Sequence, residues 1–141
     1  MRSRNSTGSA KIQPMNWIGL LVIGIGASLG AWLRWVLGLW LNPLFTNVHA
    51  GTLAANLIGG YLVGVAVAVF HVNVELSPEM RLFIITGFLG GLTTFSSFSA
   101  EMVALVQRAE WGWALGAIGL HVGGSLAMTL FGIWTINRLA A

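Results

Sequence analysis

The stretch GFLGGLTTFSSFSAE, from Gly87 to Glu101, places glycines and hydroxyl side chains in the middle of a long apolar segment. Gly90 and Gly91 are adjacent, and Thr or Ser fills five of the next eight positions. A Gly-Gly pair costs a helix about 2 kcal/mol relative to Ala-Ala, and hydroxyls offer the backbone competing partners. Backbone freed at membrane depth is tolerated only inside protein or beside a water-filled cavity, where its carbonyls can hold a cation and its amides an anion. The stretch therefore predicts a broken helix that forms an ion site.

The rest of the chain is apolar enough to lie in a membrane. Of its 141 residues, 56% are hydrophobic and 8% are charged, and the mean hydropathy is +0.81. At about 20 apolar residues per crossing, four spans fit. The sequence thus predicts an all-α integral membrane protein with four transmembrane helices, the third of them broken, over residues 17–41, 51–70, 80–106 and 112–136.

The net charge of +3 comes from the first eleven residues. A short basic tail beside a span is an orientation signal or a contact with anionic headgroups, so it does not indicate nucleic acid. Residues 1–15 are predicted to be a disordered basic leader, and residues 16–141 the four-helix domain. A secretory signal is the alternative, but the apolar run continues to Leu41, too far for one. The chain has no cysteine, which excludes disulfides and thiolate metal ligands.

The first two spans carry few polar residues. Arg34 lies about 26 Å along the helix from Trp17 and has two interpretations, a side chain that snorkels to the headgroups or a positive charge at the mouth of an anion pathway. In the second span, Thr52 and Asn56 share a helical face. Asn56 is either an interhelical hydrogen-bonding group or an amide donor presented to an ion.

The last two spans add further candidates. Phe95 and Phe98 are three residues apart and so lie on one side of a helix, and Glu101 is either a buried functional acid or a cap at the interface. In the fourth span, His121, Ser125 and Thr129 follow at steps of four. This polar stripe is either satisfied packing or a track of donors for an ion, and its lone histidine is not a metal site.

These residues do not make an enzyme. The sequence shows no Ser/His/acid set, paired carboxylates, His-rich metal site or phosphate loop. Phenylalanine rings have an electropositive edge, so ring edges with amide and hydroxyl donors can hold a small anion without a fixed cation that would trap it. The chemistry favours a weakly binding anion pore.

Charge predicts the topology only weakly. Basic residues on the side of the termini outnumber the single loop arginine opposite, which favours cytoplasmic termini, but without the tail the bias nearly disappears. A chain with weak bias can insert both ways, so an antiparallel homodimer is compatible with the sequence.

Four motifs, one in each span, resemble the Fluc/CrcB fluoride channel family. They are GASLGAWLRW (26–35), GTLAANLIGGYLVG (51–64), GFLGGLTTFSSFSAE (87–101) and GSLAMT (124–129), within a similarity that covers residues 17–136. The resemblance implies a passive fluoride channel that exports fluoride across the inner (cytoplasmic) membrane and so lowers its cellular concentration and toxicity. It also implies an antiparallel, dual-topology homodimer with two pores.

The resemblance assigns residues as well. A central structural sodium would be held by the backbone carbonyls of Gly90 and Thr93. The fluoride pathway would include Phe95, Phe98, Asn56, Thr52, Ser125, Thr129, Arg34 and Glu101. The chain departs from the family at Ala117, where some members carry tyrosine, and at His121, where others carry serine.

Two alternatives to this function remain. A small multidrug-type proton-coupled exporter is also a four-helix dimer, but it needs a carboxylate in the first span, where this chain has Arg34. A structural subunit without transport would explain the glycine faces but not the polar break.

Overall fold

The computed structural model describes residues 17–45, 48–73 and 75–140, so the predicted leader lies outside the described residues. Four stretches are long and apolar enough to cross a membrane, which confirms the four predicted spans. The first comprises α1 (Trp17–Leu41) and the short 3-10 helix η1 (Asn42–Leu44), and the second is α2 (Ala50–Val72). The third runs through α3 (Pro78–Arg81), the π-helical η2 (Leu82–Leu89), α4 (Gly90–Leu92) and α5 (Phe95–Gln107). The fourth is α6 (Trp111–Leu139).

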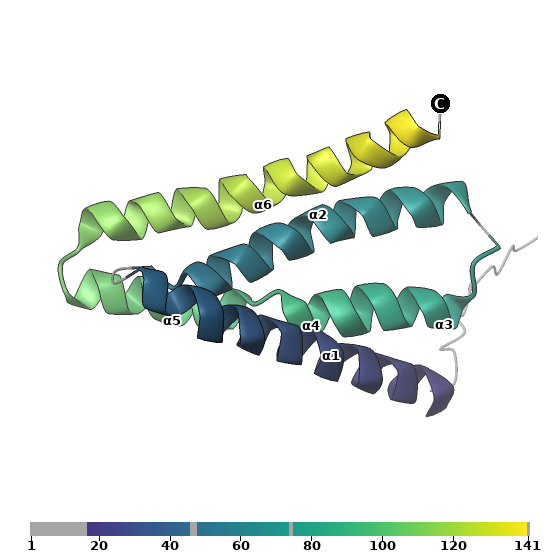
Figure 1. The fold of residues 1–141 in the computed structure, drawn as a ribbon, viewed down its shortest axis with the longest axis horizontal. Coiled ribbons are helices and arrows are strands. Elements are labelled where there is room, and N and C mark those ends of the chain that lie inside the picture. Colours follow the sequence, from purple (N-terminus) through teal and green to yellow (C-terminus); the bar gives the residue numbers. More distant parts are fainter. Residues whose placement is uncertain (1–16, 46–47, 74, 141) are drawn as a thin grey trace, which may run out of the picture.

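The helices form two pairs, α2 with α6 and α1 with the third span (Figure 1). Glycines, which have no side chain, let the backbones of paired helices come into contact. A Cβ atom on Gly64 would collide with the carbonyl of Thr129, and one on Gly30 would collide with the carbonyl of Phe88. By contrast, a Cβ at each glycine on another face of α6 would meet nothing within 4 Å: Gly112, Gly116, Gly119 and Gly123. That face is open in the single chain.

The third span changes backbone conformation at Thr93 and Thr94. Thr93 has ψ 151° and Thr94 has φ −148° and ψ 117°, both extended, and α5 begins immediately after them. Both glycines of the pair that suggested a break are helical, because α4 begins at Gly90 and includes Gly91. Gly91 serves a different purpose, because a Cβ there would collide with the backbone of Ala27 in α1.

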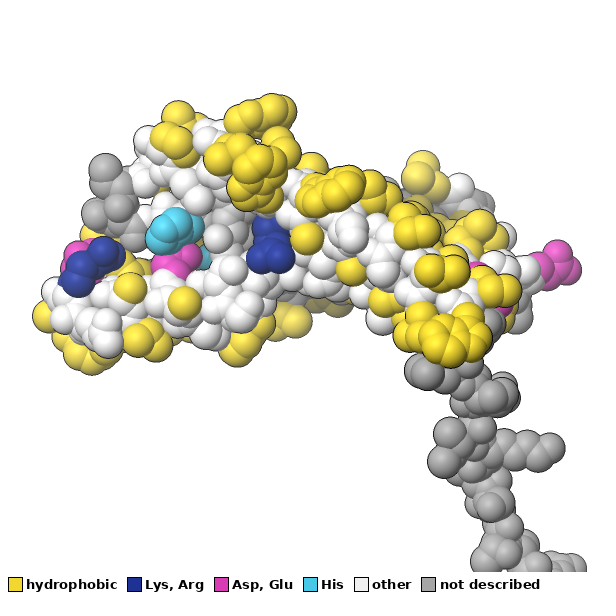
Figure 2. All heavy atoms as spheres, turned by 90° about the horizontal axis from the view of Figure 1, so that it is seen from below, with side chains coloured by type: hydrophobic (Ala, Val, Ile, Leu, Met, Phe, Trp, Pro, Cys, Tyr) yellow, Lys and Arg dark blue, Asp and Glu magenta, His cyan; other side chains and the backbone are white. Residues whose placement is uncertain are grey.

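The outer surface is apolar. Each of the seven tryptophans is more than half exposed, and the charged side chains of the described residues appear as small separate patches in the view of Figure 2. Exposed aromatic and aliphatic side chains on this scale suit a hydrocarbon solvent rather than water.

Candidate ion site

A cavity of about 340 Å³ lies where α2, the extended threonines, α5 and α6 meet. Its walls include most of the polar and aromatic residues that the sequence singled out, Asn56, Thr93, Phe95, Phe98, His121, Ser125 and Thr129. Three predicted pathway residues, Arg34, Thr52 and Glu101, lie outside this wall. We call it the central cavity.

Asn56 holds the extended backbone against α2. Its Oδ1 accepts the amide of Thr94 at 2.8 Å, and its Nδ2 donates to the carbonyl of Thr94 at 3.1 Å. The same Nδ2 lies 3.1 Å from Nδ1 of His121. Asn56 is therefore an interhelical hydrogen-bonding group in this structure, and its donation to an ion stays a prediction. The sequence did not indicate Thr94 as its partner, because only the fold brings residues 38 positions apart together.

The two phenylalanine rings lie together, with centroids 5.5 Å apart and planes at 55°. Their exposures differ, because Phe98 is 7% exposed and Phe95 is 76% exposed. Phe98 also packs against the imidazole of His121, at 4.7 Å between centroids. The two rings therefore lie on the same side of α5, as predicted, but Phe98 is buried in the chain and Phe95 faces outward.

The hydroxyls of the α6 stripe donate to backbone carbonyls. Thr129 Oγ1 lies 3.0 Å from the carbonyl oxygen of Gly60 and 2.9 Å from that of Ser125. Ser125 Oγ makes a long contact, 3.5 Å, with the carbonyl of Asn56. These bonds match the packing interpretation of the stripe, and an anion would have to displace them to use the same donors.

Arg34 and Thr52 line a second cavity, of about 510 Å³, together with Ser97. Arg34 Nε donates to the carbonyl of Gly91 at 3.2 Å. The guanidinium therefore binds a backbone carbonyl of α4, and both interpretations of Arg34 stay predictions. Ser97 was not selected from the sequence, and its place beside Arg34 depends on the packing of α1 against the third span.

Glu101 is buried and joins α5 to the start of α2. Its Oε1 accepts the amide of His49 at 2.6 Å and lies 3.3 Å from His49 Nδ1. Its Oε2 is buried without a hydrogen-bond partner among the described residues. The sequence missed His49, although a histidine just before an apolar helix offers an amide that needs an acceptor.

Two backbone carbonyls beside the extended threonines have lost their usual donors. The amide of Thr94, four residues after Gly90, donates to Asn56 Oδ1. The amide of Ser97, four residues after Thr93, donates to Thr94 Oγ1 at 3.2 Å. Side chains thus take the amides that a continuous helix would give to the carbonyls of Gly90 and Thr93.

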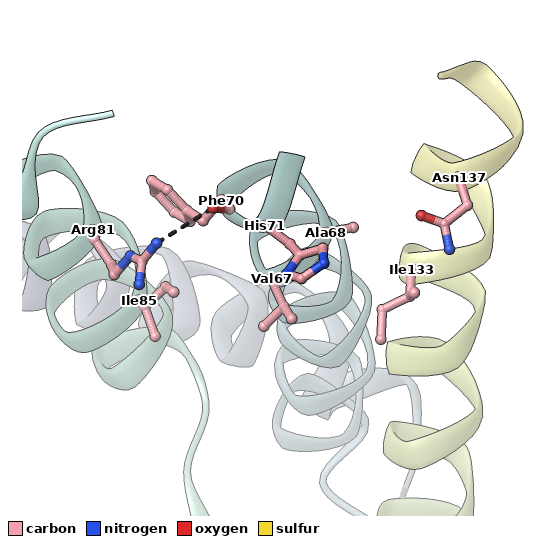
Figure 3. A pocket seen from close by; sticks show the side chains of 8 residues that line it. All are labelled: Val67, Ala68, Phe70, His71, Arg81, Ile85, Ile133 and Asn137. Atoms are coloured by element: carbon pink, nitrogen blue, oxygen red, sulfur yellow. Dashed lines mark hydrogen bonds between the residues drawn. The ribbon is translucent and has the colours of Figure 1, made fainter. Parts of the chain in front are cut away.

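A third cavity, of about 580 Å³, opens near the ends of α2 and α6 (Figure 3). Arg81 Nη2 lies 3.4 Å from the carbonyl of Phe70, and its guanidinium sits 5.2 Å from the Phe70 ring centroid. His71 and Asn137 lie apart from Arg81 in the same view. Because these polar groups do not converge, this cavity is a weaker candidate than the central one.

Four apolar spans and exposed tryptophans, with a cavity between the helices, define a multi-pass membrane protein. The family model described as "CrcB-like protein, Camphor Resistance (CrcB)" matches residues 21–133. The chain belongs to the CrcB family.

Similar proteins carry a more specific name. A Pseudomonas syringae pv. maculicola protein named "Fluoride-specific ion channel FluC" is 63% identical over 120 residues, which is 85% of this chain and 94% of the relative. A Nitrosospira multiformis protein of the same name is 58% identical over 126 residues, 89% of this chain and 98% of the relative.

Proposed function

We propose that this chain is a passive, fluoride-selective channel that exports fluoride across the cytoplasmic membrane and so lowers its cellular concentration and toxicity. The observation that carries the proposal is the central cavity, where the Phe95–Phe98 pair faces the Asn56–His121 pair and the described residues of the wall include no lysine or arginine. Ring edges and neutral donors can replace part of the hydration shell of a small anion. A fixed cation would bind fluoride too tightly for it to leave. The names of the relatives agree with this chemistry.

Fluoride efflux from liposomes tests the function. Vesicles that contain the purified protein should lose fluoride when valinomycin carries potassium out with it, and chloride-loaded vesicles should keep their contents. A proton-coupled exporter, the alternative function, would instead need a pH gradient and would move organic cations. Equal retention of fluoride in vesicles with and without protein would refute the proposal.

We infer that the extended pair Thr93–Thr94 is a break within the third span in the bilayer. The released carbonyls of Gly90 and Thr93 are the donor set that a structural sodium would use, since neutral carbonyl oxygens suit a hard cation. The diverted amides of Thr94 and Ser97 support this fit. Arg34, bonded to the neighbouring Gly91 carbonyl, would hold the loop in place without competing for the two ligands.

Removing sodium should therefore lower both thermal stability and fluoride efflux, and sodium itself should not be transported. The comparison is between sodium and potassium buffers of equal ionic strength, with recovery on adding sodium back. A protein with the same melting temperature and efflux in both buffers would show that these carbonyls hold no sodium.

We further propose that the channel is an antiparallel, dual-topology homodimer. The single chain leaves Phe95 76% exposed and leaves the central cavity open, so a second copy is needed to enclose a pathway. The open glycine face of α6 and the weak charge bias of the chain are compatible with such a partner.

Single cysteines can test the dimer because the chain has none of its own. If the break lies at the two-fold axis, Gly90→Cys should form an intermolecular disulfide. The variant should fold because, among the described residues, a Cβ at position 90 would have only the Ile85 carbonyl nearby, at 3.8 Å. Gly24→Cys is the matched control, since a Cβ at Gly24 meets nothing within 4 Å among the described residues and Gly24 lies on α1, outside the third span. The G90C variant should crosslink and the G24C variant should not. Only monomers by mass photometry, or a single terminal side in a topology assay, would contradict this arrangement.

A further inference from the structure

Glu101 is a buried carboxylate beside a histidine that can neutralise its charge. Its side chain is 4% exposed, and Nδ1 of His49, 3.3 Å from Oε1, is its ion-pair partner among the described residues. Oε1 also accepts the backbone amide of His49, and Oε2 has no hydrogen-bond partner in the part of the chain that the structure describes. An ionised carboxylate without a compensating charge is costly in a protein interior. The net charge at this position therefore depends on the imidazole of His49.

The imidazole of His49 is accessible from outside the helix bundle. Its side chain is 61% exposed, and the residue lies just before α2, at the end of the bundle where α1 ends and α5 leads into α6 (Figure 1). Histidine is the side chain whose charge most readily changes between about pH 5 and 8. A proton can thus pass between His49 and the solution at that end of the bundle without crossing the protein.

Other charged side chains at this end of the bundle have their own partners. On α1, Arg34 donates to a backbone carbonyl of α4. Between α5 and α6, Arg108 Nε lies 3.0 Å from Glu110 Oε1. Among the described residues, neither Glu101 nor His49 forms an ion pair with any of them. The charge of Glu101 is therefore compensated by His49 or not at all.

The charge of Glu101 acts on the central cavity. Glu101 follows Phe98 by three residues, so the two side chains lie on one side of α5, and Phe98 lines the cavity. His121 on α6, in the same wall, lies within the electrostatic field of Glu101. An uncompensated carboxylate at this position would repel an anion in the cavity, and a protonated His49 would cancel most of that repulsion.

We propose that protonation of His49 increases the fluoride conductance of the channel by neutralising the charge of Glu101, so that His49 is a pH sensor built into the channel. The proposal rests on the proposed function. His49 acts through Glu101 and does not contact the anion. Because the proton stays on the imidazole and is not transported, pH changes the rate of fluoride movement and leaves its equilibrium potential unchanged.

Two substitutions at position 49 fix the charge of the pair. His49→Lys keeps a cation at every pH used, and His49→Gln keeps a hydrogen-bond donor that never carries a charge. Both retain the backbone amide that Glu101 accepts, and both change a side chain that is mostly exposed, so the fold should survive. His71→Gln is the matched control, because His71 is an exposed histidine in the last turn of α2, at the other end of that helix.

The fluoride conductance of planar bilayers is measured with the same pH on both sides, at about pH 6 and at about pH 8. Currents are preferred to efflux here because neutral HF crosses lipid in acid and carries no current. The unsubstituted protein and the H71Q variant should conduct about tenfold more at the lower pH, the size expected for one unit charge several ångströms from an anion in a protein interior. At both pH values, the H49K variant should conduct at the high rate and the H49Q variant at the low rate.

Equal conductance of the unsubstituted protein at the two pH values would overturn the proposal. So would an H49Q variant that keeps the pH dependence, since another group would then be titrating. An H49Q variant that conducts at the high rate at both pH values would show that His49 only positions Glu101 by hydrogen bonding. If the unsubstituted protein carries no fluoride current at either pH, the proposed function fails first, so the two failures are distinguishable.

Discussion

Replacing either Phe95 or Phe98 by isoleucine should slow fluoride efflux about tenfold, the loss expected for roughly 1.4 kcal/mol of interaction with a ring edge. Isoleucine keeps apolar bulk but has no electropositive edge, so packing should survive while the anion loses a partner. Phe98 is buried against His121, and Phe95 faces outward, where a second chain would complete the pathway. Efflux from liposomes with each variant measures the effect.

Phe131 provides the matched control for this substitution. It lies on α6 and is 50% exposed, and it stacks on Trp134 at 5.7 Å between centroids, outside the central cavity. Phe131→Ile should leave efflux unchanged. If both pathway variants, shown to be dimeric, release fluoride at the unsubstituted rate, the rings are packing residues and the pathway lies elsewhere.

Replacing Asn56 by aspartate should block fluoride more completely, by roughly 100-fold or more, since an unpaired buried charge is among the costliest changes in a protein interior. The new carboxylate oxygen would face the carbonyl of Thr94, an acceptor that lies 3.1 Å from the present nitrogen. It would also place a negative charge beside the anion. Initial efflux rates at a fixed protein-to-lipid ratio measure the loss.

Asn73→Asp makes the same chemical change at the exposed end of α2, where Asn73 Nδ2 donates to the carbonyl of Val69 at 3.1 Å. Glu75→Gln changes a charge in the exposed turn that follows. Both controls should conduct normally. Normal efflux from the Asn56→Asp variant would place the pathway away from Asn56 and would contradict the site.

The sequence predicts the spans well because long apolar runs and terminal tryptophans depend only on local composition. The first helix begins at Trp17 and ends at Leu41, as predicted. The extended residues were harder to predict. The low helix propensity of glycine suggested a break at Gly90 and Gly91, but Gly91 is needed for the close approach of α1. The extended conformation falls on Thr93 and Thr94, and Asn56 binds the backbone of Thr94.

The candidate site too could be predicted only in part from local sequence patterns. Helical spacing places Asn56 and the His121–Ser125–Thr129 stripe on inward faces, and Phe95 beside Phe98. Spacing does not reveal that Arg34 binds the Gly91 carbonyl or that Glu101 accepts from His49, because these contacts join residues 57 and 52 positions apart. Which hydrogen-bond donors already have a protein acceptor depends on how the helices pack, so it cannot be predicted from spacing alone.

The reversal potential of single channels in a planar bilayer tests the central claim most directly. The two sides have different fluoride concentrations, chloride makes up the difference in anion concentration, and the pH is the same on both. The current should then reverse at the equilibrium potential of fluoride. Adding a pH gradient should not move it. A reversal potential near that of chloride, or one that follows the proton gradient, would contradict a passive fluoride-selective pathway.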